Sequence, residues 1–288
     1  DSVRGSGRTR NVSVLYTNIR SLYQKKDRLN ALINDSEADI VVLTETWLTS
    51  KISVDELFQC DKNFVVYRRD RSDRTGGGVL IAISDQLKSF AVSVTTDLEI
   101  IWCCLTFNYK IILGAAYRSP SFATGFCEGL HDSLNQIVVQ YPGVEIVLVG
   151  DFNYPNIQWL HSTPLFEPAS ADASSFLDVC SLFNLSQLVD QPTRVTPKSS
   201  SLLDLVLSSA PDIISSITHI PGLSDHDVLQ FALSLPATRK QKRIKSIRDY
   251  NRANFEAINT GLCIFLDSLL PRYRELSVDY IWNSHKQQ

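Results

Sequence analysis

Methionine is absent from the 288-residue sequence, which begins with Asp1. We therefore expect a fragment of a longer reading frame, so the lack of a visible targeting segment carries little weight. Long hydrophobic runs are missing too, since none approaches the roughly 18 apolar residues that a membrane helix needs. A hydrophobic fraction of 44% and a charged fraction of 20% are typical of a globular protein.

An excess of positive charge is also absent. The formal net charge is −3, which gives no overall signal for nucleic acid, although a local basic patch can supply the attraction. No cysteines stand at C-x-x-C spacing, and we interpret the six cysteines as small buried hydrophobic residues in a reducing compartment. The G-x-S-x-G, H-E-x-x-H and G-x-x-x-x-G-K-[ST] motifs are missing, so the chemistries that they carry find no support.

The stretch from Ile146 to Asn153 is the centre of the sequence pattern. Four apolar residues, three of them β-branched, predict a strand that is buried on both faces and ends at Gly150. Asp151 and Asn153 then stand at the mouth of this strand. Taken alone they are common turn residues, and only partners from other strand ends favour a functional interpretation.

Hydrophobic periodicity predicts an α/β chain. We expect helices near 25–34, 126–140 and 176–183, and strands at 12–16, 39–43, 79–83, 90–94, 100–107, 111–116, 202–207, 213–219 and 228–235. The order strand, helix, strand at the beginning predicts a parallel crossover unit. Composition suggests three parts: a flexible basic segment 1–10, one domain over 11–236, and a basic helical connector over 237–288.

A basic stretch precedes three consecutive glycines. Arg68, Arg69, Arg71 and Arg74 alternate with acids and have two interpretations, a solvated mixed-charge loop or a contact with DNA phosphates. Strand-like residues follow Gly76-Gly77-Gly78, so we favour a tight turn or a close backbone approach over a phosphate-binding loop.

Polar side chains end, or interrupt, several predicted strands. They are Asn18, Glu45, Tyr117, Asp151, Asn153, Asp204, Asp225 and His226. Each has an ordinary structural explanation by itself, but together they place acids, amides and one histidine at the ends of one fold layer. Carboxylate and amide oxygens suit Mg²⁺ or Mn²⁺ better than zinc. Asp151 is placed to act as a base toward water, while Asp204 could hold one ring nitrogen of His226 and leave the other to donate to a phosphoryl oxygen.

These residues resemble the ordered motifs of the endonuclease/exonuclease/phosphatase superfamily, which includes DNase I-like and apurinic endonuclease-like enzymes. The shared motifs are Thr44-Glu45-Thr46, Gly150-Asp151-Phe152-Asn153, Leu203-Asp204-Leu205-Val206-Leu207 and Ser224-Asp225-His226. The chain most resembles the endonuclease domain of LINE-type non-LTR retrotransposons, through Thr17–Leu22, Glu45–Leu48, Gly76–Val79, Tyr117–Pro120 and Asp151–Pro155. The resemblance covers about residues 11 to 236, and it is the order of the motifs that makes it specific.

The resemblance implies a four-layer α/β sandwich with two facing mixed sheets flanked by helices. It implies that Glu45 is the main metal ligand with Asn18 beside the metal, which would be Mg²⁺ or, alternatively, Mn²⁺. Among the catalytic residues, Asp151 would orient or deprotonate water, while Asn153 and Tyr117 would contact the phosphate. Asp204 would pair with His226, and Asp225 would lie near the leaving group.

The resemblance further implies a single-strand nick in DNA whose 3′-hydroxyl primes reverse transcription. The expected partners are double-stranded DNA, a reverse transcriptase domain in cis and the element RNA, with no membrane. Action in the nucleus would follow assembly as a cytoplasmic ribonucleoprotein. Candidate contacts to DNA phosphates are Arg20, Arg68, Arg69, Arg71, Arg74 and Arg118. Two alternatives remain open: a phosphatase or phosphodiesterase acting on a small or lipid phosphate, and a transposon relic without function.

Overall fold

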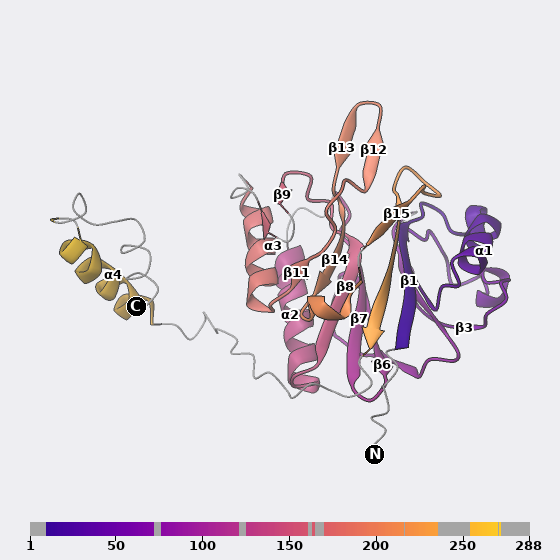
Figure 1. The fold of residues 1–288 in the computed structure, drawn as a ribbon, viewed down its shortest axis with the longest axis horizontal. Helices are drawn as coiled ribbons and strands as arrows, with labels where there is room; N and C mark the ends of the chain where they lie inside the picture. Colours follow the sequence, from indigo (N-terminus) through magenta and orange to yellow (C-terminus); the bar gives the residue numbers. More distant parts are fainter. Residues whose placement is uncertain are drawn as a thin grey trace, which may run out of the picture. The chain divides into compact units, whose positions relative to one another are not determined.

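The chain divides into two compact units, Asp1–Lys245 and Ser246–Gln288. The computed structural model describes residues 10–71, 76–120, 125–160, 163–164, 170–215, 217–235, 254–269 and 271, and Figure 1 shows its ribbon. In the second unit the described helix is α4 (Phe255–Leu269). The expected limits of the basic segment, the domain and the connector remain predictions.

Two six-stranded sheets form the first unit. The first sheet has the order β15-β16-β1-β2-β4-β3. Its strands are β1 (Arg10–Asn18), β2 (Ile40–Thr44), β3 (Phe64–Arg69), β4 (Val79–Ser84), β15 (Thr218–Ile220) and β16 (Val228–Leu235). Strands β1 and β2 are parallel and are joined through α1 (Lys26–Asp35), as predicted, whereas the other neighbours in this sheet are antiparallel.

The second sheet has the order β11-β14-β8-β7-β6-β5. Its strands are β5 (Ser89–Val92), β6 (Glu99–Thr106), β7 (Lys110–Tyr117), β8 (Glu145–Asp151), β11 (Ser186–Gln187) and β14 (Asp204–Ser208). Two small hairpins accompany it: β9 (Trp159–Leu160) with β10 (Thr163–Pro164), and β12 (Arg194–Thr196) with β13 (Ser199–Ser201). The β12-β13 hairpin projects from the body of the unit in Figure 1.

Helices cover the outer faces of both sheets, so the unit has four layers. Helix α1 packs on the first sheet through Leu29 and Ile33, while α2 (Phe126–Gln140) and α3 (Ala171–Leu182) pack on the second sheet. Short 3₁₀ helices occur at η1 (Tyr23–Lys25), η2 (Val54–Glu56) and η3 (Pro211–Ile213). The expected α/β sandwich of two mixed sheets with flanking helices is therefore confirmed.

Alternation along the strands decides which side chains meet between the sheets. In β1, Val14 and Tyr16 face the second sheet, and Leu15 faces α1. The parallel register pairs Asn18 with Thr44 in one sheet and Tyr117 with Asp151 in the other. Because Asp204 pairs with Asp151 across β14 and β8, the strand ends that carry polar residues gather at one edge of the sandwich.

Several local predictions need correction. Strand β8 continues through Gly150 to Asp151 instead of ending at the glycine, and a Cβ on Gly150 would lie 1.9 Å from the carbonyl oxygen of Ala116 on β7. The strand expected over 213–219 is replaced by η3 and the short β15, because the amide of Ile213 bonds to Ala210 within a turn. Four cysteines are buried as expected, but Cys60 is half-buried and Cys263 is exposed.

Candidate active site

Five of the predicted site residues converge where the two sheets meet. The Nδ2 atom of Asn18 donates to Asp151 Oδ2 at 2.8 Å and to Glu45 Oε1 at 3.3 Å. The hydroxyl of Tyr117 donates to the same Glu45 oxygen at 2.9 Å. Asp151 is buried beside the equally buried Asp204. Strand ends separated by more than 180 residues in sequence thus share one polar cluster.

Glu45 and Asn18 have the chemistry of a site for a hard cation. The Oδ1 atom of Asn18 is buried and has no hydrogen-bond partner among the described residues, and an unpaired buried oxygen is costly unless something binds it. The carboxylate of Glu45 lies directly beside this amide and is only partly buried. An amide oxygen and a carboxylate are ligands that Mg²⁺ and Mn²⁺ prefer, so the residues present fit a divalent metal.

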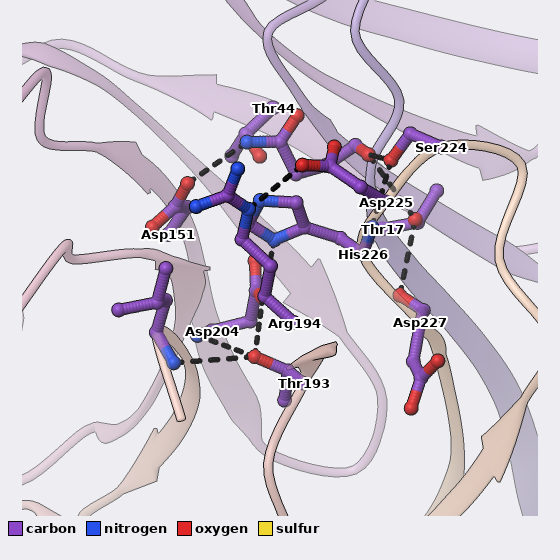
Figure 2. A network of polar contacts seen from close by, with 12 residues as sticks. Thr17, Thr44, Asp151, Thr193, Arg194, Asp204, Ser224, Asp225, His226 and Asp227 are labelled. Carbon is purple, nitrogen blue, oxygen red and sulfur yellow. Dashed lines mark hydrogen bonds and ion pairs between the residues drawn. The ribbon is translucent and has the colours of Figure 1, made fainter. Parts of the chain in front are cut away.

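A second group of possible ligands consists of Asp151, Asp204 and His226. Each offers an atom within 4.8 Å of the others. However, Asp204 Oδ1 already accepts from Tyr16, and its Oδ2 accepts from Thr193 at 2.5 Å and pairs with His226 Nδ1 at 2.7 Å. Figure 2 shows the Asp204 carboxylate between the imidazole of His226 and the hydroxyl of Thr193. This saturated hydrogen-bond network orients the histidine, and it leaves Glu45 and Asn18 as the more open position for a metal.

Burial and charge together perturb the acid–base groups of the cluster. Burial, reinforced by the neighbouring charge of Asp204, raises the pKa of Asp151 well above its usual value. Burial alone would lower the pKa of His226, but the hydrogen bond and charge of Asp204, with Asp151 and Asp225, outweigh it and raise this pKa. The imidazole therefore favours its protonated form, in which Nε2 can donate a hydrogen bond.

Backbone strain is concentrated at the same edge. Among the residues that the structure describes, seven non-glycine residues have positive φ, and five of them lie at the site: Arg20, Ser21, Glu45, Trp47 and Asn153. Such conformations persist only where the surrounding structure imposes them, and they cluster at functional sites. The strained loops pair with one another, since the amide of Ser21 bonds to Glu45 O and the amide of Trp47 bonds to Gly77 O.

The glycine triplet makes the close backbone approach that we expected. Thr46 and Trp47 donate their amides to the carbonyls of Gly78 and Gly77, which holds the loop of Glu45 in place. The indole Nε1 of Trp47 donates to Glu45 Oε2 at 3.0 Å. The φ of Gly77 is +69°, and a Cβ there would lie 2.3 Å from Glu99 Oε2.

Gly77→Ala is therefore expected to lower the thermal midpoint and the activity together. The left-handed backbone costs about 1–2 kcal/mol for an alanine, and displacement of Glu99 would shift the Glu45 loop. Gly143→Ala is the matched control, because Gly143 has the same φ of +69° but an added Cβ there meets nothing within 4 Å. Thermal melts and activity assays of both variants test this. Equal effects at both positions would show that the contact with Glu99 has no importance.

Asn153 and Arg118 support each other behind Asp151. The Nδ2 atom of Asn153 donates to Arg118 O at 2.7 Å, and its amide donates to Asp151 Oδ1 at 3.1 Å. The guanidinium of Arg118 is buried, pairs with Asp172 at 2.6 Å and lies 4.2 Å from the ring centroid of Tyr154. This geometry argues against the predicted contact of Arg118 with DNA. Arg118 instead stabilises the turn at Asn153.

The other candidate arginines differ in position. Arg68 and Arg69 lie on the edge strand β3, where Arg68 pairs with Asp70 and Arg69 donates to Thr96 O at 2.9 Å. Arg71 is paired with Glu99. None of these is the solvated loop residue of the simpler interpretation. Arg74 lies outside the described residues, whereas the side chain of Arg20 is 45% exposed at the site.

Asp225 is engaged differently from the prediction. Its two oxygens pair with Arg20 and Arg194, at 2.8 and 2.7 Å. The hydrogen bonds from both arginines lower the pKa of this carboxyl, against the opposing effect of burial. Asp225 is therefore paired with two cations beside His226, and its place near the leaving group remains a prediction.

Sequence reasoning missed Tyr16, Thr193, Trp47 and Arg194. Tyr16 left a signal, because a tyrosine facing inward from an apolar strand must find a partner for its hydroxyl, and it donates to Asp204 at 2.6 Å. Trp47 directly follows the Thr44-Glu45-Thr46 motif in the sequence. Thr193 and Arg194 left no signal in their local sequence, because their partners are Asp204 and Asp225, 11 and 31 residues further along the chain.

Comparison with known proteins agrees with this geometry. A family model described as endonuclease–reverse transcriptase matches residues 111–230. Fold and site resemble those of the DNase I-like endonuclease/exonuclease/phosphatase superfamily, a family of hydrolytic nucleases and phosphatases. No curated protein matches the chain significantly.

Solved structures share the fold at low sequence identity. The endonuclease domain of TRAS1, a telomere-specific non-LTR retrotransposon, has a TM-score of 0.60 and 17% identity, covering 78% of this chain and 99% of its own. The apurinic endonuclease LMAP of Leishmania major has a TM-score of 0.61 and 15% identity, covering 79% and 89%. The 3′-5′ exonuclease NExo of Neisseria meningitidis has a TM-score of 0.56 and 17% identity, covering 77% and 100%.

No helix in the described part of the chain has the length and apolar character needed to cross a membrane.

Proposed function

We propose that the chain is the divalent-metal-dependent endonuclease domain of a non-LTR retrotransposon and that it nicks one strand of duplex DNA. The observation that carries the proposal is the meeting of Asn18, Glu45, Tyr117 and Asp151 beside the Asp204–His226 pair. The match to an endonuclease–reverse transcriptase family and the TRAS1 neighbour favour the retrotransposon. A reverse transcriptase in cis, the element RNA and action in the nucleus after cytoplasmic assembly belong to the same proposal.

Each group then has a task in hydrolysis. A bound Mg²⁺ at Glu45 and Asn18 would neutralise charge on the phosphate. Asp151 receives the proton of the attacking water or orients it, and Asn18 and the amide of Asn153 fix the two oxygens of its carboxylate. His226, held through Nδ1 by Asp204, turns Nε2 toward a phosphoryl oxygen. Tyr117 and Asn153 complete the binding of the phosphate.

Nicking of supercoiled plasmid tests the proposal directly. We expect conversion to the open circle with Mg²⁺ and none with EDTA, and a product that a polymerase extends from its 3′-hydroxyl. The same preparation should leave inositol phosphates unchanged. Turnover of an inositol phosphate without nicking would favour the phosphatase alternative, and no turnover of either substrate would favour the relic.

Binding of the metal should be visible without catalysis. A ligand that binds only the folded protein raises the free energy of unfolding by about 2.7 kcal/mol when its concentration is about 100 times its dissociation constant. Mg²⁺ at such a concentration should therefore raise the thermal midpoint of the wild type. Glu45→Gln should lose most of this rise, while Glu128→Gln, an exposed position on α2, should keep it. If Glu45→Gln shows the full shift, the metal lies elsewhere, for example at Asp151, Asp204 and His226.

A further inference from the structure

Asp225 joins two arginines that come from different parts of the fold. Arg20 follows β1 and donates Nη1 to Asp225 Oδ1, and Arg194 begins β12 and donates Nε to Asp225 Oδ2. Figure 2 shows the contact between Asp225 and Arg194 beside the imidazole of His226. The backbones of Arg194 and His226 also form an isolated antiparallel β-bridge. The cluster therefore adjoins His226 and the proposed site of phosphate binding.

The charge of this cluster distinguishes it from the other arginine pairs. Arg68, Arg71 and Arg118 each share one carboxylate, and their side chains are 18%, 11% and 10% exposed. Arg20 and Arg194 share a single carboxylate and are 45% and 37% exposed. The three side chains of the cluster therefore carry a net charge of +1 at the surface, in a chain whose net charge is −3.

The geometry of the arginines leaves donors available. Asp225 uses only Nε of Arg194, and within the described part of the chain its two Nη atoms have no hydrogen-bond partner. Arg20 stands two residues after Asn18, in a left-handed conformation with a φ of 46°. A guanidinium fixed at one edge and open at the other is suited to a phosphate, because its planar fork loses less freedom on binding.

We propose that Asp225 orients Arg20 and Arg194 as a clamp for the backbone phosphates that flank the scissile bond of DNA. The proposal rests on the function proposed above and adds Arg194 as a binding residue and Asp225 as a positioning residue. Contacts to phosphates fix the position of a protein on duplex DNA without reading its sequence. The clamp therefore explains how a chain of negative net charge holds a polyanion at this site.

Binding of a fluorescent duplex oligonucleotide in EDTA measures the clamp without catalysis. Arg20→Ala and Arg194→Ala should each weaken binding by about tenfold and reduce the slope of log K against log salt by about 1. Arg194→Lys should recover the slope because it keeps the charge. Lys88→Ala is the matched control, because Lys88 is exposed and lies far from the site. Strand β4 begins at Val79, next to the site, and ends at Ser84, and Lys88 follows this distant end.

Asp225→Asn tests orientation separately from charge. Loss of an acid by itself strengthens attraction to DNA, whereas loss of the two ion pairs releases both arginines. The clamp predicts weaker binding than that of the wild type. Binding that is equal or tighter would show that Asp225 does not orient the arginines.

The two proposals fail in different ways. If the wild type neither binds duplex DNA nor nicks plasmid, the proposed function fails and the clamp fails with it. If the wild type nicks plasmid but Arg20→Ala and Arg194→Ala bind DNA like the Lys88→Ala control, only the clamp is overturned. Thermal melts of each variant should match the wild type within a few degrees, because both arginine side chains are largely at the surface.

Discussion

Asp151→Asn is expected to reduce the rate of nicking by about 10²–10⁴-fold, the usual contribution of a positioned base. Asp151 is buried at the end of β8, and its carboxylate accepts hydrogen bonds from Asn18 and from the amide of Asn153. Asparagine has nearly the same shape but cannot receive the proton of water. The substitution therefore removes the chemistry and leaves the packing in place.

Single-turnover nicking of plasmid, together with circular dichroism, measures this effect. Asp132→Asn is the control, because the Asp132 side chain is 72% exposed on α2 and the substitution is chemically identical. We expect the control to nick like the wild type and the Asp151 variant to remain folded. A folded Asp151→Asn protein whose rate lies within threefold of the wild type would remove Asp151 from the mechanism.

His226→Ala is expected to cost about 10²–10³-fold in rate, the loss associated with one donor to a developing anion. Asp204→Asn should act through the same imidazole, because Asp204 holds Nδ1 at 2.7 Å and raises the pKa of His226. Donation from Nε2 requires the protonated ring. Activity should therefore be present below the pKa of His226 and fall as the pH rises through it.

The pH profile of kcat/KM separates these roles. Loss of the Asp204 charge lowers the pKa of His226, so the descending limb of Asp204→Asn should move to lower pH. The chain offers a matched control in another histidine–aspartate pair, His219 and Asp227, which are 3.1 Å apart. Asp227→Asn should not shift the descending limb of the pH profile of kcat/KM. An unchanged limb in Asp204→Asn would mean that His226 does not act as a protonated donor.

Most of the sandwich was predictable because its strands and helices are strongly periodic. Helix α2 matches the expected residues 126–140, and its limits are marked by a breaker at Tyr141-Pro142-Gly143. Strand β3 was missed, because its last residues, Arg68 and Arg69, suggested a charged loop. An edge strand tolerates such residues since one side of it is open to water.

The site was predictable as a set of residues but not as a set of contacts. Motif order identified Glu45, Asp151 and His226 as members of one site, whereas nothing local showed that Thr193 and Tyr16 hold Asp204. Arg118 illustrates the opposite error. It was one of the candidate contacts to DNA phosphates, but the fold buries it against Asp172 and Tyr154.

The sequence by itself determined the α/β class, the edge of the sheets where polar residues gather, and the family resemblance, because period and motif order are properties of the chain. Only the tertiary structure decided which donor faces which acceptor. Asn18 meets Asp151 across 133 positions, and Arg20 meets Asp225 across 205. Such pairings depend on the register of strands and the packing of two sheets, and a hydrogen bond or ion pair exists only where these bring atoms within about 3 Å.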